Sequence, residues 1–584
     1  MQPTFSNISS RRRQFLWAIQ LVALIFLIGL PVTLSFANPS LPTVMHGQAH
    51  FADDGQLLTV TNSDGAIINW QSFSIGSGET TRFIQPGETS RVLNRIAGQD
   101  PSHIFGTLQS NGQVLLLNPN GVLFGAGAKV DVAGLLASTL SLSNEDFIAG
   151  RYNLNSEATG SAVENYGEIQ AQSGGYVILA GPAVTNGGMI FTPDGSTLLA
   201  AGESLLLSEP DSPELAVVVS APADQAINLG ELIAPSGKVG IYAALINQGG
   251  LVRADSVTEG PGGQIFLRAS KGVALGDTSV LSANGVTGGE IVLESDGEAT
   301  VAGTVSAVGE SGGGEIALLG GHVTVTGSSR IDASGGGGQI LVGGDFQGKN
   351  EQIKNATLTI VEQGATLNSD GGRDGEGGEV IIWSDGATDF AGEISARGGG
   401  QSGDGGFVEV SGKETLTFNG SVDASAPYGE LGTLLLDPTD IRVVAAGGNP
   451  ANVTDVDQFA DPNLGAGETA INSSVLDAAA ADILLQAEQN IFVEDPLVLN
   501  TPGAGITMQA GGNIDIWAGI VTQGGDIDLR ANDSAATNPS GTGWVGNSQA
   551  GSAILESRGG TISLSGFDVF NLSLNSSIGS AGDG

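Results

Sequence analysis

The chain has 584 residues and no cysteine. This absence excludes disulfide bonds, thiolate metal ligands and cysteine nucleophiles. Proteins that fold outside the cytoplasm often carry disulfides, so their absence is informative if the chain is exported. We hypothesise that the polypeptide crosses a second membrane unfolded, because a cross-linked loop would block a narrow pore.

Basic and aromatic residues are also scarce. The 21 Lys and Arg face 62 Asp and Glu, which gives a formal net charge of −41, and aromatic residues make up 5% of the chain. The summed negative field repels nucleic acid and anionic lipid, so neither is expected as a partner. The same charge keeps a long repeat protein soluble and discourages its sheets from associating sideways.

Helical periodicity is nearly absent, and residues 477–485 are the best candidate for a helix. Glycine, by contrast, contributes 92 residues, while charged residues make up only 14%. Hydrophobic residues reach 40%, enough for a long core. This composition is typical of a turn-rich β protein.

A six-residue block of the form Gly-Gly-x-Ile/Val-x-aliphatic recurs along the middle of the chain. Its copies begin at Gly262, Gly288, Gly313, Gly337, Gly377 and Gly405. Successive starts lie 24 to 28 residues apart, except for one interval of 40 that holds a polar insertion around residues 345–355. A second short element recurs between the blocks and begins at Leu281, Ile331, Ile394 and Val422.

Each repeat predicts one coil of a solenoid, with at least two short strands. Aliphatic and polar residues alternate in these strands, so one face points inward and the other outward. Stacked coils bury a continuous aliphatic column that a single coil could not form. We predict an all-β solenoid with Gly-rich repeats over residues 161–440, a linker or module boundary over 441–480 and further repeats over 481–584. The last repeats show no evident cap, as in a fragment of something longer.

The first 37 residues predict a signal peptide. Three arginines at 11–13 precede an apolar run over residues 21–30, and Ser-Phe-Ala at 35–37 has the small residues that a signal peptidase reads. We expect cleavage after Ala37, export by the unfolded Sec-type route and no stable membrane insertion afterwards. The alternative is an uncleaved anchor over residues 15–34, a stretch nearly long enough to span a bilayer.

The most specific short motif is Asn118-Pro119-Asn120-Gly121, between apolar strands at 114–117 and 122–124. It predicts a tight type I turn. Asn at the first position can bond the backbone ahead, Pro presets φ at the second, and Gly fits the fourth. Taken alone, such a turn is an architectural feature.

Three further segments place this motif in a family. Residues 67–73 (Ile-Ile-Asn-Trp-Gln-Ser-Phe), 93–96 (Leu-Asn-Arg-Ile) and 100–106 (Asp-Pro-Ser-His-Ile-Phe-Gly), together with the turn, resemble the two-partner secretion, or haemagglutination-activity, domain of the filamentous haemagglutinin family. The resemblance is close over residues 41–154 and predicts such a domain over 38–160. The second Asn-Pro-Asn-Leu motif and the cysteine pair of some members are missing.

The resemblance implies a right-handed parallel β-helix with an N-terminal cap. It also implies a dedicated outer-membrane transporter with polypeptide-transport-associated domains, for which Asn118, Pro119, Asn120 and Gly121 are a recognition determinant. A purely architectural role of the turn in the cap stays open. We expect Asn118→Ala to reduce secretion while the purified chain still folds, because one local hydrogen bond is worth only roughly 0.5–1.5 kcal/mol.

The family further implies a secreted or cell-surface protein that is not an enzyme and holds no cofactor. We expect an adhesin or structural rod that binds an unknown surface ligand, either protein or carbohydrate. A polysaccharide lyase or hydrolase is the alternative, because β-helices also host carboxylate-based sugar chemistry. The few Arg and Lys residues and the low aromatic content argue against this enzyme.

Metal sites and catalytic triads have little support in the sequence. His46 and His50 lie four apart, a spacing that brings two ligands together on a helix, but this region is extended, so no metal is expected there. His103 and His322 are isolated, which leaves no visible Ser-His-Asp arrangement. Residues 370–376 (Asp-Gly-Gly-Arg-Asp-Gly-Glu) could form an oxygen-rich calcium loop, but they lack the sustained repeat of calcium-binding β-rolls and fit a corner turn better.

Overall fold

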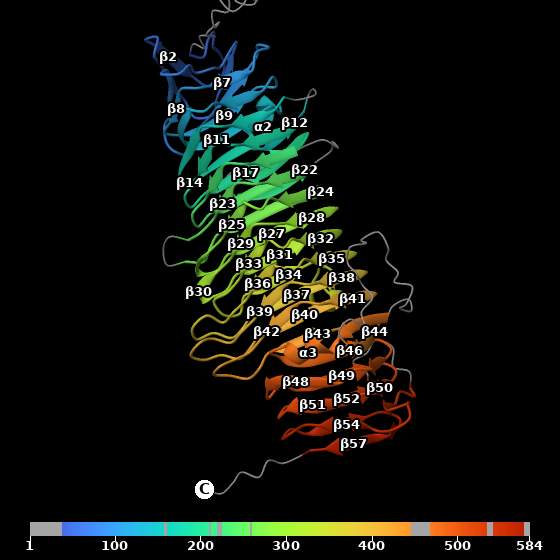
Figure 1. Cartoon of the computed structure of the whole chain (residues 1–584). Helices are drawn as coiled ribbons and strands as arrows, with labels where there is room; N and C mark the ends of the chain where they lie inside the picture. The colour runs from blue at the N-terminus through green and yellow to red at the C-terminus, as the bar shows by residue number, and fades with distance from the viewer. Residues whose placement is uncertain are drawn as a thin grey trace, which may run out of the picture.

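A computed structural model describes residues 38–156, 161–209, 212–218, 225–256, 260–445, 468–533 and 541–576. Strands stack along one axis from the N-terminal to the C-terminal end (Figure 1). Forty-eight of them belong to one sheet. The predicted signal peptide, with its cleavage site after Ala37, lies outside the described residues. No helix within the described ranges has the length and apolar character needed to cross a bilayer.

One coil of the stack consists of three strands, for example β27 (Glu290–Ser295), β28 (Glu298–Val301) and β29 (Thr304–Ser306). Each pairs in parallel with the strand one coil farther along, namely β31 (Glu315–Leu319), β32 (His322–Val325) and β33 (Arg330–Asp332). Three parallel ladders therefore run along the molecule (Figure 1), and the predicted parallel β-helix is confirmed.

The core forms because alternate residues of each strand point inward. In β27, Ile291 and Leu293 are buried, whereas Val292 between them is partly exposed. Ile291 is in register with Ile265 of the preceding coil and Ile316 of the next. The inward positions therefore form a continuous aliphatic column along the stack. The Gly-Gly blocks supply the first strand of each coil and the second repeated element supplies the third.

The glycine pair before each first strand is required by the close approach of neighbouring backbones. A Cβ on Gly288 would lie 1.9 Å from the carbonyl oxygen of Ala307 and 2.3 Å from the amide nitrogen of Gly314. No side chain fits there unless the backbone moves. The pair therefore marks the same corner in successive coils, which explains its period.

Antiparallel strands close the N-terminal end of the core. β1 (Thr43–His46) pairs with β4 (Ala66–Trp70), and β2 (Ala49–Asp53) pairs with β3 (Leu57–Asn62). The buried Trp70 ring meets the edges of Phe51 and Phe73, each with centroids 5.6 Å away. These contacts cover the first parallel coil, so the predicted N-terminal cap is confirmed.

A second apolar layer covers one outer face near this end. It contains α2 (Asn144–Ile148) and an antiparallel sheet of β12 (Tyr152–Asn155), β18 (Ser204–Glu209) and β19 (Ser212–Val218). Phe147 and Tyr152 pack with outward-facing residues of the β-helix such as Leu115 and Ile178. The strands beneath this layer, such as the second half of β11 (Lys129–Ser138), are therefore buried on both faces.

The stack continues through the predicted boundary at 441–480. There β44 (Asp440–Val444) pairs with both β45 (Glu468–Asn472) and β47 (Ile491–Val493), while residues 446–467 lie outside the described part of the chain. A module boundary stays a prediction, but the sheet is not broken on either side.

The best helix candidate, residues 477–485, is helical only at its first two residues. The helix is α3 (Ser473–Ala478), and β46 (Asp482–Ala487) follows it. Ile483 and Leu485 alternate toward the core in register with Leu434 and Leu436. The alternation of buried and exposed residues, with a period of two, makes this segment a strand although the Ala-rich stretch before it favours a helix.

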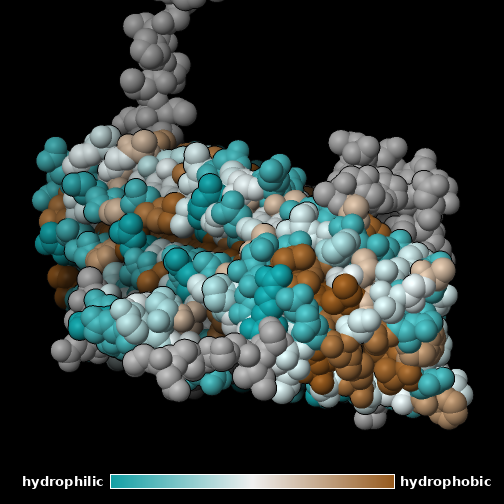
Figure 2. Space-filling view, turned by 60° about the horizontal axis from the view of Figure 1, so that its bottom comes forward, coloured by the Kyte–Doolittle hydropathy of each residue, from teal (hydrophilic) through white to brown (hydrophobic). Residues whose placement is uncertain are grey.

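At the C-terminal end the apolar residues of the last described coil are not covered by the described part of the chain. Phe567 is 75% exposed and Leu574 is 56% exposed. Figure 2, turned so that this end comes forward, shows a broad group of hydrophobic side chains over it. Within the described residues, this last coil therefore lacks the cover that β1 and β2 give to the first.

Candidate functional site

The motif at residues 118–121 forms the turn between β9 (Gln113–Leu117) and β10 (Val122–Phe124). The amide of Gly121 donates to the carbonyl of Asn118 at 3.1 Å, the hydrogen bond expected in a type I turn. Gly121 has a φ of +121°, which residues with a Cβ rarely adopt. Pro119 is exposed at the tip. The predicted turn is confirmed.

Asn118 is fully buried, and its side chain makes more contacts than the sequence suggested. Its amide nitrogen donates to the carbonyl of Asp100 and to the hydroxyl of Ser102, both at 3.0 Å. Its oxygen accepts from the backbone amide of Asn120 at 3.0 Å and from the Asn120 side chain at 3.1 Å. The expectation of one local hydrogen bond is therefore wrong, because the neighbouring coil supplies two partners.

Asn120 ties the turn to the same neighbouring loop. Its side-chain nitrogen donates to the carbonyl of Gly98 at 3.0 Å. Val122, just after the turn, is in register with Ser102 of that coil. The two asparagines therefore hold the turn against residues 98–102, and Pro119 with part of Asn120 is left facing solvent.

A groove of about 540 Å³ lies beside the turn and is the feature that the sequence did not reveal. Its lining combines Pro119 with residues of the outer layer, among them Leu142, Asn144 and Asn153. Arg95 lies in its wall and donates to the Asn144 side chain at 3.0 Å and to the Leu142 carbonyl at 2.7 Å. Arg95 and Asn144 are 49 positions apart, so no local pattern joins them.

The other candidate residues are not brought together. His46 and His50 lie on different exposed strands, β1 and β2, and His322 lies alone on β32. His103 stacks on Phe105 with ring centroids 6.1 Å apart. Among the described residues, no three His, Asp or Glu side chains gather in a way that could hold a metal ion.

The possible calcium loop at residues 370–376 is a corner of the stack. The Asp370 carboxylate accepts from the Ser395 hydroxyl at 2.5 Å and from the Arg397 backbone amide at 2.8 Å. Its second oxygen accepts from the Arg397 guanidinium at 2.6 Å. Both carboxylate oxygens of Asp370 therefore accept hydrogen bonds from the next coil, which fits the corner-turn interpretation.

Buried amides form a ladder along another corner. The nitrogen of Asn165 donates to Asn186 at 2.8 Å, Asn186 donates to Asn228 at 2.8 Å, and Asn228 donates to Gln248 at 2.9 Å. All four side chains are at most 1% exposed. Each amide thus satisfies the next across one coil spacing.

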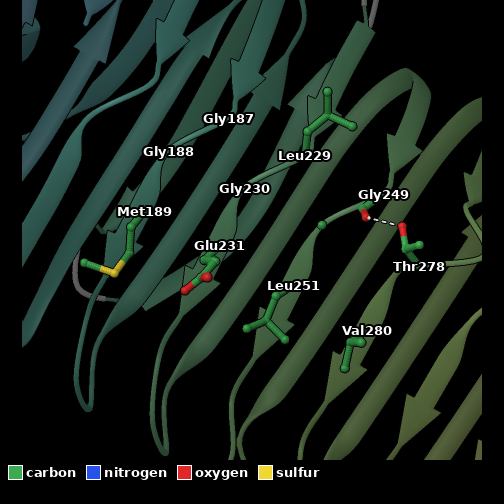
Figure 3. A pocket seen from close by; sticks show the side chains of 11 residues that line it. Gly187, Gly188, Met189, Leu229, Gly230, Glu231, Gly249, Leu251, Thr278 and Val280 are labelled. Carbon is green, nitrogen blue, oxygen red and sulfur yellow. Dashed lines mark hydrogen bonds between the residues drawn. The ribbon is translucent and has the colours of Figure 1, made fainter. Parts of the chain in front are cut away.

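A second hollow, of about 560 Å³, lies against this corner. Met189, Glu231, Leu251 and Val280 occupy one register column along its floor (Figure 3). Thr278 closes one side by donating to the carbonyl of Gly249 at 3.3 Å. Glu231 is the only ionisable residue in the lining, so no acid–base pair converges here.

Comparison with known proteins relates the N-terminal half of the chain to secretion domains. The family model described as "TPS secretion domain" matches residues 43–271. A heme/hemopexin-binding protein of Haemophilus influenzae strain Rd is 31% identical over 220 residues, which are 36% of this chain and 24% of that protein. A second heme/hemopexin-binding protein of H. influenzae is 49% identical over 80 residues, 14% of this chain and 9% of its own. This chain thus spans a quarter or less of those relatives.

A solved structure agrees in fold as well as in sequence. The crystal structure of the HMW1 secretion domain from Haemophilus influenzae is 34% identical, with a TM-score of 0.56, and the match covers 68% of this chain and 100% of that one. A TPS secretion domain implies a dedicated outer-membrane transporter as partner and passage across the outer membrane. The chain therefore belongs to the family of two-partner secretion substrates, which carry a TPS secretion domain.

Proposed function

We propose that the turn at Asn118, Pro119, Asn120 and Gly121, with the groove beside it, is the surface that the outer-membrane transporter binds. The observation that carries this proposal is that the residues of the turn have two different environments. Asn118 and Asn120 are held by the neighbouring coil, while Pro119 is exposed and lines the groove. A rigid, exposed tip beside a hollow suits recognition because little conformational freedom is lost on binding.

Pro119→Glu tests contact at the tip. We expect the amount of protein in the medium to fall at least several-fold, with accumulation or degradation in the periplasm, because a charge is placed at the contact. The free energy of unfolding should change by only about 1 kcal/mol, since exposed positions tolerate substitution. Immunoblots of medium and periplasm from cells that express the transporter measure the first quantity, and urea denaturation of purified protein measures the second.

Pro86 provides a matched control, because it is another exposed proline in a turn of the same domain. Pro86→Glu should be secreted normally. Equal secretion of the two variants, whether both normal or both reduced, would reject a specific contact at Pro119.

The β-helix beyond this domain is proposed to act as an adhesin or structural rod on the cell surface or in the medium. Its inward residues form an uninterrupted core, so the outward side chains of many coils are available for a partner. The net charge of −41 disfavours anionic partners, which leaves a protein or a neutral or basic carbohydrate as the ligand class. The relatives' names add heme and hemopexin as ligands to test, with hemin as the heme compound, although the shared segment is 24% of the first relative.

Binding of the purified mature chain to immobilised glycans, extracellular proteins and hemin tests the rod proposal. We expect saturable binding to a glycan or a protein and no release of reducing ends from acidic polysaccharides. Saturable binding to hemin alone would replace adhesion by heme capture, and release of reducing ends would restore the enzyme alternative.

A further inference from the structure

The polar insertion in the 40-residue interval of the repeat forms a segment that crosses several coils. Residues 345–355 connect β34 (Gln339–Val342) to β35 (Leu358–Val361). The segment begins with the short helix η1 (Phe346–Gly348), whose N-cap Asp345 accepts from the Phe346 amide at 2.7 Å. Gln347 has a φ of +51°, a conformation that non-glycine residues adopt only when surrounding contacts hold them there.

Those contacts come from three later coils at once. The backbone amide of Gln347 donates to Glu409 Oε2 at 3.1 Å. Its side-chain nitrogen donates to Asp437 Oδ2 and to Gln486 Oε1, each at 2.8 Å. Glu409 lies on β40 (Phe407–Gly412), Asp437 follows β43 (Thr433–Leu436), and Gln486 lies on β46. The segment is therefore a strap, and Gln347 is the residue that joins it to all three of these coils.

The strap also covers apolar surface on the outside of the β-helix. Leu341, Ile381 and Trp383 form a buried outer cluster, and Ile353 of the strap packs against it. The Phe346 ring meets the edge of Phe407 with centroids 5.8 Å apart. Opening the strap would expose this cluster to water, so the strap stays closed unless something opposes its contacts.

Ionisation of Glu409 is the change that can destabilise the closed strap. It is fully buried, and its register neighbours on the two adjacent strands are Ile381 and Leu435. Its Oε1 has no hydrogen-bond partner among the described residues. An ionised carboxylate in this position would lack a counter-ion, and burying an unpaired charge is strongly unfavourable.

The charged groups around Glu409 do not neutralise it. Burial raises its pKa to about 8, with further increases from Asp437 and Glu379, while the Gln347 amide and Ser411 lower it only in part. On the strap, Lys349 contacts Gln347 and acts on Asp437, and Lys354 pairs with Asp296. The strap's own acidic residues are Asp345, which accepts from the Phe346 amide and the Asn350 side chain, and Glu351. Asp385, Lys413 and Glu488 line the hollow beside Asp437.

We propose that residues 345–355 form a pH-sensitive strap, closed over protonated Glu409 and released when Glu409 ionises. Release would uncover the outer cluster of Leu341, Ile381 and Trp383 beside the hollow that Asp437 and Gln486 line. This gives the rod a surface that differs between acidic and mildly alkaline surroundings.

The direction of the effect follows from proton linkage. In the open strap the Glu409 carboxyl returns toward its ordinary pKa of 4.5, so the open form binds fewer protons than the closed form. Closure is therefore strongest below pH 4.5 and weakens as the pH rises to about 8. Asp437, whose pKa burial raises to about 6, acts in the same direction at lower pH. Between pH 6 and pH 8 the change in closure therefore comes mainly from Glu409 and not from Asp437.

Hydrogen–deuterium exchange of the full mature chain, read for peptides within residues 345–355, tests the strap. After correction for intrinsic exchange, we expect the opening constant to rise roughly fifty-fold from pH 6 to pH 8 in the wild type. Glu409→Gln keeps the shape and cannot ionise, so its opening constant should change less than about threefold. Glu393→Gln alters an exposed carboxyl on a different ladder and should behave as the wild type does.

Two results would overturn the proposal. In the first, the wild-type strap shows no change in its opening constant between pH 6 and pH 8 once intrinsic exchange is corrected for. This result needs no variant, so it is decisive even if Glu409→Gln fails to fold. The other is an unchanged pH dependence in folded Glu409→Gln.

Discussion

Asn186→Leu is expected to lower the local free energy of unfolding by about 2–6 kcal/mol, because it interrupts the buried amide ladder. Asn186 accepts from Asn165 and donates to Asn228, and all three side chains are buried. Leucine has the same branching and the same number of side-chain heavy atoms, and it makes neither bond. The Asn165 nitrogen and the Asn228 oxygen would then be left in a dry core, each at a cost of about 1–3 kcal/mol.

Hydrogen exchange of the flanking strands measures this effect better than a single melting temperature. Long repeat arrays unfold in segments, so a global two-state value is not defined. We expect protection to drop in the coils that contain Asn165, Asn186 and Asn228 and to persist in the N-terminal cap. Asn419→Leu, at an exposed position, is the matched control and should leave protection unchanged. Loss of protection in neither variant would show that the ladder contributes little to stability.

In a repeat protein, contacts between adjacent coils can be predicted from the sequence more readily than contacts that skip coils. Each coil repeats the same small set of contacts, so alternation in residues such as Ile291 and Leu293 was enough to predict the strands of a solenoid, whereas their parallel pairing was expected from the family resemblance. The register is local in this fold because the next coil is also the next repeat. A repeated glycine pair marks the first strand, whereas the middle strand, for example Glu-Ala-Thr-Val at 298–301, has no such marker.

Contacts that skip coils were not predictable. Gln347 reaches Glu409, Asp437 and Gln486 across separations of 62, 90 and 139 residues. The insertion was visible as a long interval, but nothing in its composition says which face it covers or that a carboxyl lies beneath it. The groove beside Pro119 was missed for the same reason, since its wall is built by the outer layer around Asn144 and Asn153.

The turn itself was predicted correctly from local chemistry, while the role of its first residue was not. A type I turn needs only its own four residues, and the Asn118–Gly121 hydrogen bond is present. The two further partners of Asn118, the Asp100 carbonyl and the Ser102 hydroxyl, come from the preceding coil. The sequence therefore predicted one local hydrogen bond for an asparagine that is in fact buried against another coil.

This difference changes the expected outcome of Asn118→Ala. The substitution removes four side-chain hydrogen bonds and leaves the Asp100 carbonyl and the Asn120 amide without their buried partner. We expect the secretion domain to lose about 3–5 kcal/mol of stability, well above the value for one local bond. Secretion should fall together with stability, because the tip at Pro119 loses its support.

Comparison with Pro119→Glu separates the two roles of the turn. If the transporter binds the exposed tip, Pro119→Glu should reduce secretion with stability preserved, and Asn118→Ala should reduce both. Urea denaturation of the isolated proteins and the ratio of medium to periplasmic protein provide the two quantities for each variant. An Asn118→Ala chain that keeps wild-type stability and still fails to reach the medium would mean that the asparagine side chain itself is recognised, which requires the transporter to meet the turn before the coil beneath it has formed.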